Sequence, residues 1–361
     1  MKHSFISVIG IVGIALSGCT SNEEWVEPVG QSDAEIRFAA NADHTRGVDY
    51  TTNNLTSFNV YAYTISGSSG TPQLFMQDVE VSKTGSNLWT YSPVEYWPAD
   101  ESVDFYAYAP AGWLGSATPL EPVAYDSYPG DRDIIYAVNP GLRGNSDMAN
   151  AQVLMNFRHA LSKMTVKLSS TNAELRVQVS NVVVNNVKTK GNFHFPAAST
   201  SGVASADNVG TWTDQNSPTM YPLHMSQSKS DVINLTTTPT DLSGSSTGMG
   251  GARYMTPQSL VWLNNGGQED MYIAVMCSIY DVRTGQKLWP NENTPSEDVV
   301  PGSTFGDGIL KFPLATSSVK DWQPGVHYIY SLVINSNEDM GQIEFGTPTV
   351  DTYVEVNTLY E

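Results

Sequence analysis

The chain of 361 residues carries 18 Lys and Arg against 37 Asp and Glu, which gives a formal net charge of −19. This balance argues against a nucleic-acid partner, because contacts to phosphate require clustered Lys and Arg. Only 15% of the residues are charged, 10% are aromatic, and 29 Gly and 20 Pro favour many turns. The length predicts two domains, and the composition predicts an all-β protein of the extracellular type.

The first 19 residues have the features of a targeting segment. Lys2 and His3 precede an apolar run from Phe5 to Leu16, which is too short to remain as a membrane-spanning helix. The run ends in Leu-Ser-Gly-Cys, which resembles a bacterial lipobox. That resemblance implies that Cys19 receives lipid on its sulfur, becomes the mature N-terminus and anchors the protein to a membrane. An ordinary secretion signal with a chance cysteine is the alternative.

Residues 20–46 follow as a polar tether and a short strand. Ile36 and Phe38 alternate with the polar residues Glu35 and Arg37, which is the pattern of a strand with one buried face. A polar loop then ends in Thr-Arg-Gly at positions 45–47. On local sequence alone, the arginine of this tripeptide is an exposed loop residue.

Short strands separated by turn signals fill the next part of the chain, which we assign to an N-terminal β-sandwich at residues 47–160. This density of short strands, without a segment of helical period, is typical of antiparallel β-sandwiches. The strands are expected near residues 58–65, 74–82, 89–91, 104–109 and 133–138.

The stretch from Val153 to Leu168 marks the junction between the two predicted domains. Apolar residues occupy odd positions from Val153 to Phe157 but even positions from Met164 to Leu168. Because the side chains of a strand alternate with a period of two, one continuous strand cannot keep both sets on one face. We therefore expect a bulge, a bend or a crossing between sheets at residues 159–162, where His159 makes structural hydrogen bonds.

The remaining residues, 161–361, are assigned to a C-terminal β-sandwich. Residues 175–187 predict either a strand pair or one long bent strand. Farther on, Cys277 shares one strand face with Ile273, Val275 and Ile279. It is therefore expected to be a small buried apolar residue rather than half of a disulfide.

Patterns that carry metal or catalytic chemistry are not found in the sequence. The six His are scattered without the spacing of a metal site, and Cys-x-x-Cys does not occur. Gly-x-Ser-x-Gly at 244–248 lies in a low-complexity loop, without the strand and helix that a nucleophile elbow requires. Asp126, Asp131 and Asp133 crowd a turn, but their spacing is not that of an EF-hand, and a solvated turn is favoured. We expect no enzyme activity, no cofactor and no metal.

Taken in order, several pieces of the sequence resemble the fimbrillin-like family. These proteins are lipoprotein-derived pilus subunits of Gram-negative anaerobes, with two antiparallel β-sandwich domains of the transthyretin-like kind in tandem. The resemblance spans nearly the whole chain, and its pieces are fold motifs rather than active-site motifs. They are the lipobox at Cys19, Ile36–Phe38 with Thr45-Arg46, Trp89–Tyr91, Tyr96–Pro98, Asp104–Pro110, Asp133–Ala137, Phe157–Lys163, and Trp322–Gly325 leading into Tyr328, Tyr330 and Leu332.

The resemblance implies assembly by donor-strand exchange. The subunit reaches the cell surface as an outer-membrane lipoprotein precursor, and a protease cuts between Arg46 and Gly47. The first strand, which carries Ile36 and Phe38, then leaves its sandwich, and a strand from a neighbouring subunit replaces it. The candidate for the incoming strand is segment 342–357, with its apolar residues Ile343, Phe345, Val350, Val354 and Val356. The product is a structural or tip subunit of a fimbria that supports adhesion.

The partners that this resemblance implies are other pilus subunits and, for the precursor, the outer membrane through lipid on Cys19. Two alternatives stay open. In the first, the chain is a surface lipoprotein that binds a glycan or a host protein and never polymerises. In the second, it is a pilus anchor subunit that keeps its N-terminal strand. The uncut subunit is expected to be a monomer that holds Ile36 and Phe38 in its own N-terminal sandwich.

Overall fold

The structure is a computed structural model, and part of the chain is described by it. Some of the residues singled out above lie outside the described residues, namely Cys19, Arg46, Gly47, Ile343, Phe345 and Val356. The described residues are 31–42, 50–51, 53–67, 70–85, 88–144, 152–242, 252–263, 269–335 and 349–354.

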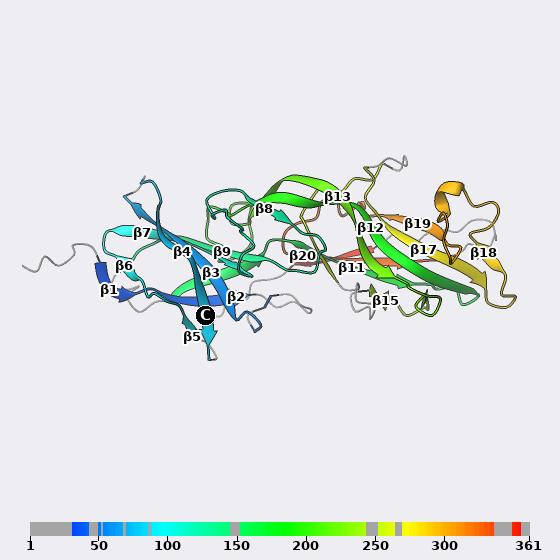
Figure 1. Cartoon of the computed structure of the whole chain (residues 1–361), viewed down its shortest axis with the longest axis horizontal. Coiled ribbons are helices and arrows are strands. Elements are labelled where there is room, and N and C mark those ends of the chain that lie inside the picture. Colours follow the sequence, from blue (N-terminus) through cyan, green and yellow to red (C-terminus); the bar gives the residue numbers. More distant parts are fainter. Residues whose placement is uncertain are drawn as a thin grey trace, which may run out of the picture.

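Strands make up almost all the regular structure of the described residues, which confirms the all-β prediction (Figure 1). A short 3-10 turn, η2, lies at Ser296–Asp298. Within the described residues, no helix has both the length and the apolar character needed to span a bilayer. The strands of the N-terminal half are β1 (Gln31–Glu35), β2 (Arg37–Ala42), β3 (Ser57–Ser66), β4 (Gln73–Thr84), β5 (Leu88–Thr90), β6 (Tyr96–Pro98), β7 (Glu101–Ala109), β8 (Val123–Asp126), β9 (Ile135–Leu142) and β10 (Gln152–His159).

The N-terminal half contains a seven-stranded sheet with the order β2-β10-β9-β7-β3-β4-β5, and β1 pairs separately with β6. The apolar residues on one face of the large sheet enclose a first core, which contains Ile36, Phe38, Phe58, Phe105 and Val153 among others. These side chains come from strands that are far apart in the sequence. The first core therefore depends on correct strand pairing across the whole sheet, from β2 at one edge to β5 at the other.

The C-terminal half contains two further sheets, which share a second core. One has the order β15-β11-β20-β21 with β16 on β11, and the other has the order β13-β12-β17-β18 with β8, β14 and β19 at its sides. Both sheets contribute to the second core, for example through Tyr330 and Val275. The strands are β11 (Ser162–Ser169), β12 (Leu175–His194), β13 (Thr211–Met225), β14 (Ile233–Asn234), β15 (Thr240–Asp241), β16 (Arg253–Met255), β17 (Tyr272–Asp281), β18 (Lys287–Trp289), β19 (Gly308–Pro313), β20 (Val326–Val333) and β21 (Thr349–Val354).

The chain crosses from one sheet system to the other where the apolar parity changes. β10 ends at His159 in the large N-terminal sheet, and β11 begins at Ser162 in a C-terminal sheet. Phe157 is buried in the first core, and Met164 is buried in the second. The crossing therefore lets each set of alternating apolar residues face its own core, and it confirms the expected crossing between sheets.

A third apolar cluster, the junction cluster, joins the halves. Tyr61, Tyr108 and Tyr136 of the large sheet pack there with Trp113 and with Phe193 of β12. Because β3, β7 and β9 also face the first core, these strands are buried on both faces. The long hairpin of β12 and β13 reaches over the N-terminal half to supply this cover (Figure 1).

The pairing departs from a purely antiparallel pattern at two places. β2 lies parallel to β10, and β11 lies parallel to β20. β8 departs from the expected domain assignment instead. It belongs to the segment expected in the N-terminal sandwich, but it pairs antiparallel with β12 of the C-terminal half. Of the two alternatives for residues 175–187, the structure shows one long strand of 20 residues, with register shifts in its pairing to β17 and β13.

Candidate functional site

The N-terminal strand occupies one edge of the large sheet. Phe38 of β2 lies opposite Val153 of β10, and the parallel register continues from Arg37 to Ala42. β2 has β10 as its one neighbour in the sheet order. The residues that receive this strand, namely Phe58, Tyr91, Glu95, Phe105 and Val153, are called the strand site below.

The segment changes sheets at Ile36. Before this residue β1 pairs with β6, and after it β2 pairs with β10. Ile36 N donates to Glu95 O at 2.9 Å, and Tyr91 OH donates to Ile36 O at 2.8 Å. Both backbone groups of the crossing residue are therefore paired, as a buried peptide requires.

The inward side chains of the segment are completely buried. Ile36 and Phe38 are each 0% exposed. The ring of Phe38 makes edge contacts with Phe58, Tyr91 and Phe105, at centroid distances of 6.3, 5.2 and 5.8 Å. Burying two such side chains contributes about 1.5–3 kcal/mol each, so the strand fills an essential part of the first core.

Tyr91 is neutral when it binds the strand. Burial, the main cause, together with nearby carboxylates raises its pKa to about 12. A neutral phenol at physiological pH can donate its proton to Ile36 O, whereas a phenolate cannot. The hydroxyl also accepts from Glu95 N at 3.2 Å, which fixes the loop beside β6 against the strand.

Beyond β2, the next described residue that forms a long-range contact is Tyr50. Its backbone N donates to Asp133 Oδ2 at 3.1 Å, and the same oxygen lies 2.8 Å from His159 Nδ1. Asp133 is buried, and so the chain is tied to the junction just after the segment that contains Arg46 and Gly47. His159 has the structural hydrogen-bonding role that was expected of it, and Asp133 belongs to this contact rather than to a solvated turn.

The C-terminal strand lies in the other half of the molecule. Val350 and Val354 belong to β21, where they pair antiparallel with Tyr330 and Val326 of β20. Ile36 and Phe38 of the same chain therefore occupy the strand site, as expected of an uncut subunit. It does not bring β21 to that site.

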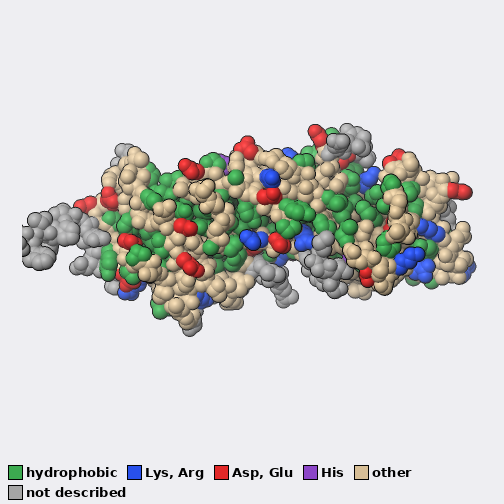
Figure 2. Space-filling view, viewed as in Figure 1, with side chains coloured by type: hydrophobic (Ala, Val, Ile, Leu, Met, Phe, Trp, Pro, Cys, Tyr) green, Lys and Arg blue, Asp and Glu red, His purple; other side chains and the backbone are tan. Residues whose placement is uncertain are grey.

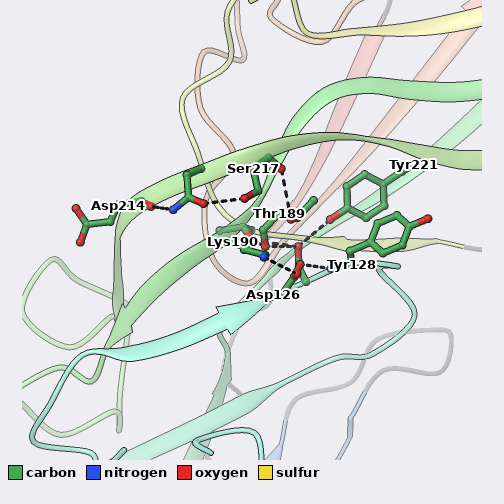
Figure 3. A network of polar contacts seen from close by, with 10 residues as sticks. Asp126, Tyr128, Thr189, Lys190, Asp214, Ser217 and Tyr221 are labelled. Atoms are coloured by element: carbon green, nitrogen blue, oxygen red, sulfur yellow. Dashed lines mark hydrogen bonds and ion pairs between the residues drawn. The ribbon is translucent and has the colours of Figure 1, made fainter.

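A buried polar network fixes the loop after β8 to the C-terminal half (Figure 3). Ser127 Oγ lies 2.8 Å from Tyr221 OH and donates to Thr189 O at 3.1 Å. Thr256 Oγ1 lies 3.0 Å from Ser127 Oγ and 2.9 Å from Thr189 O, and its hydroxyl can donate to either. At the edge of the network, Lys190 and Asp126 form an ion pair at 3.8 Å. These groups satisfy one another, so the network holds the halves together rather than offering a ligand site.

An open cleft of about 660 Å³ lies beside the junction. Its lining includes Trp212, Gln215, Ser259 and Asp321. Trp212 Nε1 donates to Ala160 O at 2.7 Å, and Ser259 Oγ donates to Asp321 Oδ1 at 2.5 Å. Within the part of the chain that the structure describes, no group of three or more His, Cys, Asp or Glu could hold a metal ion.

Cys277 and the surface charges complete the account of the sequence candidates. Cys277 is 0% exposed in β17, and burial raises the pKa of its thiol, which confirms it as a core residue. On the face shown in Figure 2, acidic and basic side chains are interspersed with apolar ones. This face carries no extended basic surface of the kind that binds phosphate.

Two parts of the strand site were not identified from the sequence. The first is the parallel pairing of β2 with β10, and the second is the role of Tyr91 and Glu95 in binding the backbone of Ile36. Trp89–Tyr91 and Tyr96–Pro98 were recognised as fold motifs, but neither motif indicates which remote strand it meets. The only sequence signal for this role is that both motifs lie next to a turn, which does not identify the strand that they contact.

Comparison with known proteins agrees with this architecture. The chain matches the family model described as fimbrillin-like over residues 45–351. Among solved structures it is similar to a fimbrial protein from Bacteroides vulgatus, with a TM-score of 0.51, 14% identity, and coverage of 90% of this chain and 100% of that chain. A search of curated proteins finds no match.

Two further solved structures are similar at lower scores. The tip fimbrial protein Mfa3 from Porphyromonas gingivalis, with a C-terminal truncation, has a TM-score of 0.39 and 13% identity, covering 88% of this chain and 100% of that chain. A fimbrial assembly protein from Parabacteroides distasonis has a TM-score of 0.39 and 12% identity, covering 88% of this chain and 98% of that chain. The family match over residues 45–351 spans most of the sequence, and the chain belongs to the fimbrillin-like family.

Proposed function

We propose that this chain is a structural or tip subunit of a surface fimbria, and that it assembles by exchange of its first strand. The observation that carries the proposal is the position of β2. This strand completes the first core with two fully buried side chains, yet it is an edge strand with one sheet neighbour. An edge strand can be replaced by another strand without disturbing the rest of the sheet.

Proteolysis between Arg46 and Gly47 supplies the trigger in this proposal. Both residues lie between the end of β2 and Tyr50, which is tied to Asp133. A cut there leaves the segment through Ala42 attached by non-covalent contacts alone, while the chain from Tyr50 onward stays fixed to the junction. The incoming strand comes from segment 342–357 of another subunit.

The membrane stage of the proposal depends on Cys19. Lipid on this residue would anchor the precursor to the outer membrane before the cut releases it into a fimbrium. Cys19→Ala is expected to abolish incorporation of labelled palmitate and to leave an unprocessed precursor in the inner membrane. Normal surface display of this variant would contradict the lipoprotein assignment.

The assembly test uses purified precursor and an arginine-specific protease. Cut wild-type protein should give a ladder of oligomers on a gel run without boiling, with Gly47 as the new N-terminal residue. Arg46→Lys, which keeps the charge but not the cleavage specificity, should remain monomeric. A chain deleted from Gln342 onward should receive a strand but not provide one, and so should stop growth in mixtures. Strictly monomeric cut wild-type protein at high concentration would rule out strand exchange.

A second candidate function rests on the cleft beside the junction. Its mixture of an aromatic side chain, amides and a carboxylate suits a hydroxyl-rich ligand, which favours the non-polymerising binder of a glycan or host protein. The pilus anchor, which keeps its first strand, is the related alternative. Retained lipid and an intact Arg46 in surface protein would favour either of these over the exchanging subunit.

A further inference from the structure

The dipeptide Arg-Gly occurs twice in the sequence, at positions 46–47 and 143–144. The second copy follows β9 directly, and the side chain of Arg143 is exposed. Its Nη1 donates to Asp100 O at 3.2 Å, in the turn between β6 and β7. A protease that recognises arginine meets the same residue pair at both positions. If it cuts at one of them alone, the fold must protect the other.

The peptide bond between Arg143 and Gly144 is held by contacts on both sides. A Cβ on Gly144 would overlap Cβ and Cγ of Trp97, so only glycine allows this close approach. On the other side of the bond, Leu142 pairs with Val103 in the ladder between β9 and β7. Proteolysis of a folded protein acts on a locally opened state. These contacts must therefore open before the bond can be cut.

The first strand helps to hold Trp97 in place. Trp97 belongs to β6, and in the described sheets the one partner of β6 is β1, with Glu35 opposite Tyr96. The ring of Trp97 is 0% exposed and lies 5.7 Å from the ring of Phe105, which in turn lies 5.8 Å from the ring of Phe38. Contacts thus run from the first strand through Trp97 to the second Arg-Gly bond.

We propose that the Arg143–Gly144 bond is a second, latent site for the arginine-specific protease, and that it is shielded while a strand fills the strand site. The proposal rests on the proposed strand exchange and goes beyond it, because it assigns a further processed bond and makes its cleavage depend on occupancy. When β1 and β2 leave, β6 loses its strand partner and Phe105 loses the ring of Phe38, which frees Trp97 from Gly144. Hydrolysis then adds water across the amide and leaves a carboxylate on Arg143 and an amine on Gly144.

A cut at this bond would disable the subunit that suffers it. The bond lies between β9 and β10, which are neighbours in the large sheet, and β10 is the strand that receives β2. A subunit that has lost its first strand without gaining another would lose the covalent link between these two strands. A subunit that has received a strand would keep it. The second site would thus remove empty subunits and spare assembled ones.

Timed digestion with an arginine-specific protease tests the order of the two cuts, with fragments identified by mass and N-terminal sequence after boiling. In wild-type protein Gly47 should appear first, and Gly144 later and in the unassembled fraction. An excess of a synthetic peptide of residues 31–42 should refill the strand site and slow the second cut by about tenfold or more, which corresponds to about 1.4 kcal/mol of opening free energy. A scrambled peptide should not. Arg46→Lys should protect both bonds, and Arg143→Lys should abolish the second cut alone.

Gly144→Ala in the Arg46→Lys background tests the shield directly. The added Cβ cannot coexist with Trp97 in its present position, so the bond after Arg143 should be cut without the first cut, about tenfold or more faster than in Arg46→Lys alone. Circular dichroism checks that the variant is folded. Gly112→Ala in the same background is the control and should stay resistant, because its Cβ would have no atom within 4 Å.

Equal cutting after Arg143 in wild-type and Arg46→Lys protein would overturn the shielding by the first strand, and resistance of Gly144→Ala would overturn the role of Trp97. Oligomers from cut wild-type protein, without a Gly144 fragment in the unassembled fraction, would overturn the second site and leave strand exchange intact. The reverse result, a Gly144 fragment after the first cut but no oligomers, would support the second site and refute exchange between subunits. The absence of both would refute the two proposals together.

Discussion

Phe38→Ala tests whether the first strand is an integral part of the N-terminal core. The substitution removes a ring that is 0% exposed and that contacts Phe58, Tyr91 and Phe105. Deleting a buried Phe side chain costs about 3–5 kcal/mol, since both the transfer free energy and the packing of the cavity lining are lost. We expect the uncut variant to lose this much unfolding free energy.

The matched control is Arg37→Ala on the same strand. Arg37 points outward, with a side chain that is 54% exposed and an ion pair to Glu35 at 3.5 Å. Exposed pairs of this kind are worth about 0–1 kcal/mol. Urea unfolding of the N-terminal half, followed by the fluorescence of Trp89 and Trp97 in the first core, measures both variants.

Hydrogen exchange in β2 gives the local measurement. A loss of about 3–5 kcal/mol should speed the exchange of the β2 amides by about two to three and a half powers of ten, because each 1.4 kcal/mol is tenfold. The amides of β20, which lies in the other half, should change far less. A cost below about 1 kcal/mol for Phe38→Ala, or equal effects of the two substitutions, would refute the argument that this side chain anchors the strand.

Three further predictions concern the contacts around the strand site and the junction. In the folded protein the pKa of Tyr91 is raised from 10.0 to about 12. The contribution of its neutral hydroxyl to the free energy of unfolding should therefore be complete below pH 10 and lost as the pH rises toward 12. Tyr91→Phe should remove this part of the alkaline destabilisation seen by circular dichroism. Gly130→Ala should lower the melting temperature, because Gly130 has a φ of +80° and a Cβ there would lie 3.0 Å from Tyr221 Cε1. The control is Gly112→Ala. Gly112 also has a φ of +80°, but no atom lies within 4 Å of its Cβ position, so this variant measures the backbone strain without the steric clash. Asp133→Ala should lower the free energy of unfolding by about 1–3 kcal/mol, because it removes the acceptor of the part-buried Tyr50 N and the carboxylate beside His159 Nδ1, whereas the exposed neighbour Asp131→Ala should cost little. Equal melting temperatures would refute the bracing role of Asp133.

The junction was predictable because it follows from a local rule. The change from odd to even apolar positions between Phe157 and Met164 cannot be met by one continuous strand, and the structure resolves it by crossing between sheets. The same rule explains β12, where Val179 and Val182 are both buried and the pairing with β17 shifts between them. A bulge restores the inward direction of the side chains.

The remote pairings were not predictable in the same way. Turn signals and alternation favour antiparallel neighbours that follow one another in the chain, whereas β2 meets β10 and β11 meets β20 in parallel, across long intervening segments. Tyr61 and Tyr63 alternate with Val60 and Ala62, so the sequence indicates burial on both faces of β3. It does not indicate that Phe193, from the far end of β12, helps to cover the outer face.

Residues 36–39 (Ile-Arg-Phe-Ala) and residues 343–346 (Ile-Glu-Phe-Gly) share Ile and Phe at the same spacing, and this bears on what drives exchange under the proposed mechanism. Two strands with the same buried residues gain almost the same free energy from the same site, so affinity alone cannot favour the incoming one. Before the cut, the resident strand competes as part of the same chain, at an effective concentration that reaches the millimolar range for short linkers. After the cut, a departed strand is diluted into solution, whereas the C-terminal segments of neighbouring subunits stay concentrated at the growing end. Under the proposed mechanism, the cut between Arg46 and Gly47 would therefore set the direction of assembly, and an incoming strand with large apolar residues at the same spacing would keep the first core filled after exchange.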